Sequence, residues 1–241
     1  MNNKVYREIK HGRFLAQQNT ESIWGWDTPA GRLRAKRRGE MIATAAGLKP
    51  GLRVLEIGCG TGLFTEIFAK FGVDLIAIDI SAELIEKARN RNINGNVVFV
   101  EGRFEDNDLE GEFDAVIGSS VLHHLELEPA LKKIYSLLKP GGFLSFAEPN
   151  QLNPQVFFMF KFRTLFPEVS PDENPFLRWR LQRELTASGF TSPVIKPFDW
   201  LHPSTAPALI KSVSRLGIFL EKCPVLCEFA GSLLIKAVKP A

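Results

Sequence analysis

The residues best suited to chemistry lie in a glycine-rich turn that follows a short apolar run. Glu56 ends the run, and Gly58, Gly60 and Gly62 follow at alternate positions. Glycines let the backbone turn tightly and allow a ligand to approach it closely. Such a turn between a strand and a helix is the usual nucleotide crevice of an open α/β sheet. Leu63 occupies the place of the next glycine in the dinucleotide fingerprint, which favours an adenosine ligand without a pyrophosphate.

A second acid, Asp79, ends the next apolar run of the chain. A carboxylate at this place can accept hydrogen bonds from both hydroxyls of a ribose. The alternative for Asp79 is a structural one, as a helix cap or turn residue. Asp79 alone does not distinguish one adenosine-containing cofactor from another.

Three further side chains are candidates for moving a proton. His123 and His124 follow one apolar run, and Glu148 ends another. If the reacting group is a hydroxyl, a base among them helps to remove its proton. The alternatives are histidines that hold their loop by backbone hydrogen bonds and an acid that stabilises the turn before Pro149. The sequence leaves both readings open.

Strands and helices alternate along the chain and must position these side chains. Helices are expected at 30–46, 63–71, 81–90, 129–138, 177–188 and 207–221, and strands at 53–57, 75–79, 97–100, 113–118, 143–147, 194–198 and 233–238. This order predicts a doubly wound α/β fold with helices on both faces of a sheet. The candidate residues then gather at the carboxyl ends of the strands. Residues 1–20 are polar, and we expect them to be loosely ordered.

The 241 residues suit one elaborated domain. We divide it into an N-terminal helical segment (1–50) that contributes to a cap, a cofactor-binding core (51–149), and a lid or acceptor region with the closing strands (150–241). The net charge of +3 is too small to indicate nucleic-acid binding. The basic run from Arg32 to Arg38 is either a solvated helix face or a patch for an anionic substrate or a membrane surface.

The cysteines and the N-terminus exclude several classes of protein. Three cysteines do not make a disulfide framework, and no histidine is placed to complete a metal site with Cys223 and Cys227, so we expect no metal. The polar first ten residues do not resemble a signal peptide. No apolar run is long enough for a membrane span. We therefore expect a cytoplasmic protein.

Three segments together resemble the class I S-adenosylmethionine (SAM)-dependent methyltransferases. They are Leu55–Gly62, Phe113–Leu125 and Leu137–Leu144, and their order is that of the type 11 methyltransferases related to the ubiquinone and menaquinone biosynthesis enzymes. Trp26–Arg32 is similar to a segment that precedes the core in these enzymes. The resemblance implies a Rossmann-like, seven-stranded mixed sheet with a small cap, and SAM as the cofactor.

The resemblance also implies a set of cofactor-binding residues. Many relatives carry Gly-Asp-Ala where this chain has Gly102-Arg103-Phe104, and an arginine cannot accept the hydrogen bond of the adenine amino group. The backbone N–H of Phe104 remains for the ring, with Glu105 or Asp106 as a substitute acceptor. The implied set is Glu56, Gly58, Cys59, Gly60, Asp79, Ile80, Arg103, Phe104, Ser119 and Ser120.

The acceptor is expected to meet a segment rich in phenylalanine. Five phenylalanines between 157 and 166 favour a bulky apolar or lipid-like small molecule, unless they bury one another as a cap core. We expect methyl transfer to oxygen in preference to carbon, with His123, His124 or Glu148 as the catalytic group. The alternatives are a non-catalytic module that binds SAM or a partner, and an NAD-dependent oxidoreductase.

Overall fold

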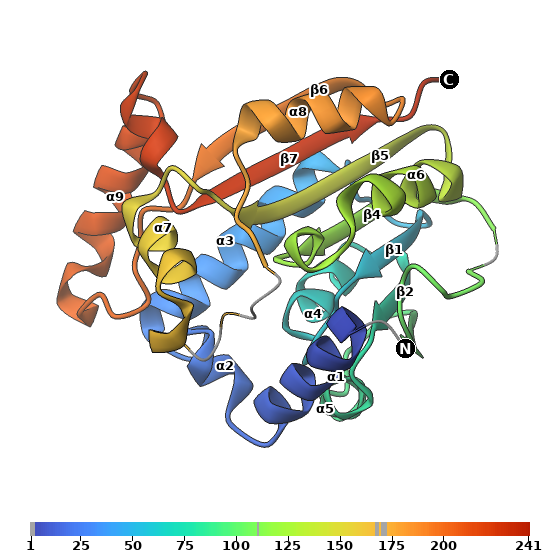
Figure 1. Ribbon diagram of the computed structural model, residues 1–241, viewed down its shortest axis with the longest axis horizontal. Coiled ribbons are helices and arrows are strands. Elements are labelled where there is room, and N and C mark those ends of the chain that lie inside the picture. The colour runs from blue at the N-terminus through green and yellow to red at the C-terminus, as the bar shows by residue number, and fades with distance from the viewer. Residues whose placement is uncertain (1–2, 110, 167–168, 170–172) are drawn as a thin grey trace.

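The sheet has the strand order β3-β2-β1-β4-β5-β7-β6 (Figure 1). Strand β7 runs in the direction opposite to that of the other strands. This computed structural model describes residues 3–109, 111–166, 169 and 173–241. The seven-stranded mixed sheet confirms the predicted fold class. Its strands are β1 (Arg53–Ile57), β2 (Asp74–Asp79), β3 (Val97–Glu101), β4 (Phe113–Ser119), β5 (Leu138–Pro149), β6 (Thr191–Phe198) and β7 (Ser232–Val238).

Helices connect the strands and precede the sheet. Within the described ranges, no helix has both the length and the apolar character that crossing a membrane requires. The α-helices are α1 (Asn3–Ala16), α2 (Thr20–Ile23), α3 (Pro29–Ala45), α4 (Leu63–Ala69), α5 (Ala82–Arg89), α6 (Leu127–Leu137), α7 (Pro154–Lys161), α8 (Arg178–Ala187) and α9 (Ile210–Leu220), and the 3₁₀ turns are η1 (Leu122–His124), η2 (Arg163–Leu165), η3 (Pro207–Leu209) and η4 (Leu226–Phe229).

The two faces of the sheet are buried under different helices. In β1, Leu55 and Ile57 point into the core formed with α6 and α8, whereas Val54 points into the core formed with α3 and α4. Successive side chains of a strand alternate between faces, so a strand that is apolar throughout needs cover on both sides. Figure 1 shows α6 and α8 on one side of the sheet and α3 on the other. The carboxyl ends of β1, β2, β4 and β5 are left at one edge.

The expectation of a loosely ordered N-terminus is wrong, because residues 3–16 form α1. The helix is polar overall but packs against α5. Leu15 is buried, and Arg13 Nε donates to Glu83 Oε1 at 3.0 Å. A Cβ added to Gly12 would lie 2.9 Å from the Ser81 side chain, so the two helices are in close contact there. Tertiary contact, which a weak apolar pattern does not reveal, stabilises this segment.

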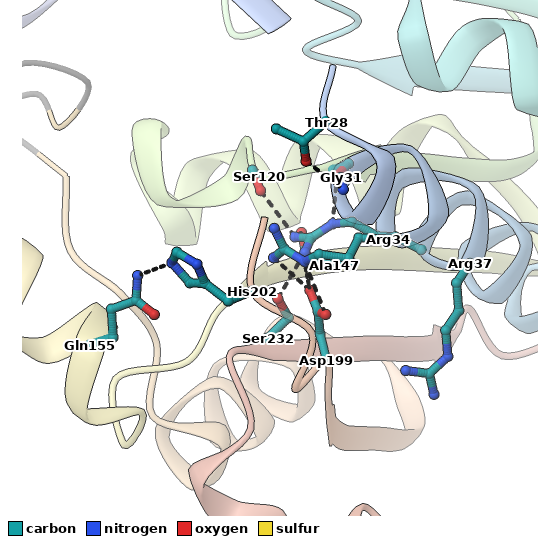
Figure 2. A network of polar contacts seen from close by, with 12 residues as sticks. Thr28, Gly31, Arg34, Arg37, Ser120, Ala147, Gln155, Asp199, His202 and Ser232 are labelled. Carbon is teal, nitrogen blue, oxygen red and sulfur yellow. Dashed lines mark hydrogen bonds and ion pairs between the residues drawn. The ribbon is translucent and has the colours of Figure 1, made fainter. Parts of the chain in front are cut away.

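The basic run of α3 is divided, because Arg32 and Lys36 are exposed whereas the other members contact protein groups. Arg34 binds the carboxylate of Asp199 at 2.7 Å, and Arg37 binds Glu221 at 2.5 Å. Figure 2 shows Arg34 directed at Asp199, beyond the end of β6. Arg34 and Arg37 therefore join α3 to the C-terminal part of the chain, and the expected solvated face is limited to Arg32 and Lys36.

Arg38, on the same helix, is fully buried and makes four hydrogen bonds. It donates to Ser119 Oγ (2.8 Å), Ser120 Oγ (3.0 Å), Ser232 Oγ (2.8 Å) and the carbonyl of Ala147 (2.7 Å). Figure 2 shows Ser120, Ala147 and Ser232 converging beside Arg34. Burial lowers the pKa of Arg38 to about 10, which still leaves the guanidinium charged at neutral pH. One side chain thus holds together α3 and the ends of β4, β5 and β7.

Replacing Arg38 with methionine should lower the free energy of unfolding by roughly 3 kcal/mol, because the buried carbonyl and hydroxyls lose a charged donor. Urea unfolding measures this change. Lys36→Met on the same helix is the control, because Lys36 is 70% exposed and its pair with Glu40 is a surface one; its change should stay within about 0.5 kcal/mol. Equal midpoints for the two variants would contradict the role of Arg38.

Candidate active site

A cavity of about 780 Å³ lies at the carboxyl ends of β1, β2 and β4. This volume is in the range of small-molecule sites. Its wall also includes side chains from α1, the α2 region and α7, so the N-terminal segment and the segment after β5 both cover it. Two predicted residues, Glu56 and Glu148, are absent from the wall. The predicted residues that line it are Gly58, Cys59, Gly60, Asp79, Ile80, Arg103, Phe104, Ser119, Ser120, His123 and His124.

The glycine turn has the backbone conformation that its sequence requires. Gly58 and Gly60 have φ values of +70° and +52°, which side chains other than glycine rarely adopt. The two positions differ in their surroundings. A Cβ on Gly58 would lie 2.5 Å from Val121, whereas a Cβ on Gly60 would lie 3.4 Å from the ring of Trp24, which lines the cavity. Gly58 is therefore needed for packing, and Gly60 for the shape of the cavity.

Asp79 is held by the backbone and keeps capacity for a ligand. Its Oδ2 accepts from the N–H of Gly60 at 2.8 Å, and its Oδ1 accepts from the N–H of Ser81 at 2.9 Å. Burial raises its pKa, and these two hydrogen bonds oppose the rise. Each carboxylate oxygen has a second lone pair, so two ribose hydroxyls could still donate to it. The expected ribose contact fits this geometry.

Glu56 does not reach the cavity. It is fully buried in β1, and burial raises its pKa to about 8, so its carboxyl is mostly protonated at neutral pH. Its Oε2 atom has no hydrogen-bond partner in the described part of the structure. Glu56 therefore lies beneath the glycine turn and does not line the cavity, and its expected place in the cofactor site stays a prediction.

Arg103 is close to the two acids, Glu105 and Asp106, that were expected to replace the missing adenine acceptor. The guanidinium of Arg103 binds Asp106 at 2.6 Å and lies 3.6 Å from Glu105. Both acids are thus close to Arg103, the residue that stands where many relatives carry the acceptor. Phe104 is 3% exposed, with Lys133 Nζ over its ring at 5.3 Å, which fixes this segment against α6.

Glu148 orients His123 from behind. Glu148 Oε1 accepts from the N–H groups of Val121 (3.0 Å) and Leu122 (2.9 Å), and its Oε2 lies 2.6 Å from His123 Nδ1. Burial alone would raise the pKa of Glu148, but the hydrogen bond and charge of His123 and the two backbone N–H groups lower it. The ionised carboxylate therefore places the imidazole proton on Nδ1 and directs Nε2 to the cavity.

Glu173 faces both histidines and was not predicted. Its Oε2 lies 3.6 Å from His123 Nε2, too far for a hydrogen bond, and its Oε1 lies 3.3 Å from His124 Nδ1. The donor atoms of these three residues all lie within 4.8 Å of one another, so the group could hold a metal ion. The expectation of no metal rested on the cysteines, did not consider this group, and stays a prediction.

Other residues that line the cavity were also not predicted from the sequence. His202 lines the cavity, and its Nε2 lies 2.8 Å from Gln155 Nε2 (Figure 2). Trp24 and Trp26 line the wall as well. No local pattern marks Glu173 or His202, because only the folded chain brings them to the ends of the strands.

Comparison with known proteins agrees with the fold and the glycine turn. Residues 55–146 match the methyltransferase domain family. A ubiquinone biosynthesis O-methyltransferase of Xanthomonas campestris is 37% identical over 154 residues, which are 61% of this chain and 63% of the relative's own length. A malonyl-[acyl-carrier protein] O-methyltransferase of Priestia megaterium is 32% identical over 99 residues, 40% of this chain and 36% of the relative.

Solved structures extend the similarity to nearly the whole fold. A SAM-dependent methyltransferase of Thermotoga maritima has a TM-score of 0.67 at 19% identity and covers 95% of this chain and 99% of its own. The N-methyltransferase NodS of Bradyrhizobium japonicum, solved with S-adenosylhomocysteine, has a TM-score of 0.58 at 19% identity, over 89% and 90% of the two chains. Residues 55–146 are therefore similar to a methyltransferase domain, and the chain has the fold of the SAM-dependent methyltransferases, as the sequence motifs implied.

Asp79→Ala should weaken SAM binding by about 2–4 kcal/mol, because two charge-assisted hydrogen bonds to the ribose are lost. Isothermal titration calorimetry measures the affinity. Asp74→Ala is a matched control at the other end of β2, where the carboxylate is exposed and accepts only from Asn96 in the described contacts. Unchanged affinity in the Asp79 variant would place the ribose elsewhere.

Gly60→Val should fold and lose SAM binding, because its side chain narrows the cavity beside Trp24. Gly47→Val controls for backbone strain, since Gly47 has a φ of +65° with no atom within 4 Å of an added Cβ. Both variants should lose about 1–2 kcal/mol of stability, but Gly47→Val should bind SAM normally. Thermal unfolding and calorimetry give the two readouts. Normal binding by folded Gly60→Val would show that the turn serves structure alone.

Proposed function

We propose that this chain transfers a methyl group from SAM to an oxygen of a small or medium apolar acceptor. The observation that carries the proposal is His123, which lines the same cavity as the glycine turn and Asp79 and is held from behind by Glu148. SAM supplies an electrophilic methyl group and leaves as S-adenosylhomocysteine. The O-methyltransferase names of two sequence relatives support oxygen over carbon.

His123 is proposed to act as the general base. Its Nδ1 proton is held by Glu148, so Nε2 has a lone pair to accept the proton of an acceptor hydroxyl. The hydroxyl oxygen then forms the new bond to the methyl carbon as the carbon–sulfur bond breaks. The remaining contribution of the protein is alignment of the two reactants in a cavity from which water is excluded.

The covering segments are proposed to select the acceptor. Met159, Phe160 and Phe166 line the cavity from the side of α7 and η2, and the ring of Phe160 lies 6.2 Å from that of His123. This apolar wall suits an acceptor with a bulky apolar body and a hydroxyl directed at His123. The proposed division into segments 1–50, 51–149 and 150–241, and a cytoplasmic location, belong to the same proposal.

Incubation of the protein with methyl-labelled SAM and extracts that contain hydroxylated aromatic compounds or lipids tests the proposed function. A labelled product that carries the new methyl group on an ether oxygen would support O-methylation. SAM binding with no labelled product from any extract would favour the non-catalytic module instead. NADH binding in place of SAM binding would favour the oxidoreductase.

His123→Gln should lower the rate of methyl transfer by about 10²–10⁴-fold with little change in SAM affinity, because it removes the base and not the cofactor contacts. Glu148→Gln should lower it less, since the imidazole remains but loses its orientation. Glu128→Gln, an exposed acid on α6, is the matched control and should keep the parent rate.

Chelator-treated protein should also keep the parent rate, because the proposed base is a ring nitrogen. A rate that falls on chelation and returns with a divalent ion would assign the role to a metal on His123, His124 and Glu173. A His123→Gln enzyme with normal turnover would remove the histidine from the chemistry.

A further inference from the structure

Exposed apolar side chains concentrate at one end of the molecule. Within the described chain, most of the large hydrophobic residues that are mainly exposed come from residues 157–165 and 209–229. Phe219 is 62% exposed and Val225 is 71% exposed, whereas Phe158 and Phe162, which contact each other, are 47% and 44% exposed. Contiguous apolar surface of this kind marks an interaction site in a folded protein.

The two segments form a single surface because hydrogen bonds join them. Asn153, which caps the start of α7, donates from Nδ2 to the carbonyl of Phe229 at 2.8 Å. Asn150 donates from Nδ2 to the carbonyls of Glu228 (2.8 Å) and Ala230 (2.7 Å). Figure 1 shows α7 and α9 at the same end of the fold, beyond the strand ends. The surface formed by residues 157–165 and 209–229 is called the apolar end below.

Val225 projects from the apolar end in a conformation that costs energy. Its φ of +68° is one that β-branched residues rarely adopt. Such strain persists only where the surroundings impose it, and it clusters at functional positions. The consequence here is that the turn between α9 and η4 presents an apolar side chain at its tip, where it is the most exposed large hydrophobic residue of the described chain.

The exposed charges of the apolar end are positive. Lys161 lies over the rings of Phe157 (5.5 Å) and Phe162 (6.0 Å), and α9 and its end carry the exposed cations Lys211, Arg215 and Lys222. The two acids of the same segments are turned inward. Glu221 pairs with Arg37, and Glu228 pairs with Arg178 at 2.7 Å. Apolar side chains surrounded by cations are typical of elements that lie in the interface of an anionic bilayer.

We infer that the apolar end docks on a membrane surface that contains anionic lipids, with α7 and α9 in the headgroup region. Lipid tails cover the phenylalanines and Val225, and the cations contact lipid phosphates. Gln155, Met159 and Phe160 on α7 line the cavity, so docking brings the cavity wall to the bilayer. An apolar acceptor would then enter from the lipid. This last point rests on the proposed function, whereas the docking itself does not.

Vesicle flotation of the full chain tests the docking. The protein should float with vesicles of phosphatidylcholine mixed with phosphatidylglycerol, and much less with phosphatidylcholine alone. The double variant Phe219→Ser, Val225→Ser should bind at least roughly tenfold more weakly, because two apolar side chains no longer enter the lipid. Val98→Ser is the control, since Val98 is 54% exposed on β3 at the opposite edge of the sheet, and it should float like the parent.

Two further measurements separate docking from folding and from methyl transfer. SAM affinity and circular dichroism of the double variant should match those of the parent, because both side chains are exposed. A charge variant, Arg215→Glu with Lys222→Glu, should lose its preference for anionic vesicles and keep SAM binding. Failure of methyl transfer with intact flotation would sink only the proposed function.

Absence of flotation with anionic vesicles would overturn the inference. Equal flotation of the parent and the double variant would overturn it as well. Light scattering that shows a dimer in the parent and a monomer in the double variant would assign the apolar end to a second copy of the chain instead of a membrane.

Discussion

The buried guanidinium of Arg38 is the interaction on which the site depends. A buried charge is tolerated only when hydrogen bonds replace its lost water, and Arg38 finds them on Ser119, Ser120, Ser232 and Ala147. These four acceptors come from the ends of β4, β5 and β7. The carboxyl ends of the parallel strands β4 and β5 and the start of the antiparallel strand β7 meet at the same edge of the sheet, and the guanidinium joins them by hydrogen bonds.

That constraint extends from Ser120 to the proposed base. Ser120 has a φ of +55°, and its N–H donates to the carbonyl of Ala147 at 2.8 Å. The chain therefore turns sharply after β4, and the next residues, Val121 and Leu122, direct their N–H groups at Glu148. Glu148 in turn orients His123. A helix that precedes the sheet thus supports, through one side chain, the loop on which the histidine lies.

The sequence predicted the sheet well because its signals are local. Strands with apolar residues on both faces and glycine turns each depend on a few neighbouring residues, and so do the helix caps Thr28 and Ser81 that the structure shows. Helix α1 was missed because its stability comes from contact with α5, far along the chain. The basic run of α3 was misread for the same reason: the partners of Arg34 and Arg37 lie beyond residue 198.

The residues of the candidate site are of the same two kinds, those that local sequence predicts and those that only the fold brings together. Asp79 and Gly60 could be assigned from their positions after strands, and the backbone contacts of Asp79 agree with that assignment. Glu56 occupies the expected position in the chain but points away from the cavity, since alternation along β1 places it opposite Ile57, which lines the wall. Glu173 could not be found, because no pattern relates it to His123, and only the path of the chain after β5 brings them together.

Helix α7 presents apolar side chains both to the cavity and to the outer surface. Apart from Gln155 and Lys161, its residues are apolar, yet none of them is fully buried. Met159 and Phe160 face the cavity, while Phe157 and Phe158 face outward. A bound acceptor would cover the first pair, and only a second apolar medium would cover the other. The cavity wall and the apolar outer surface therefore share one short helix.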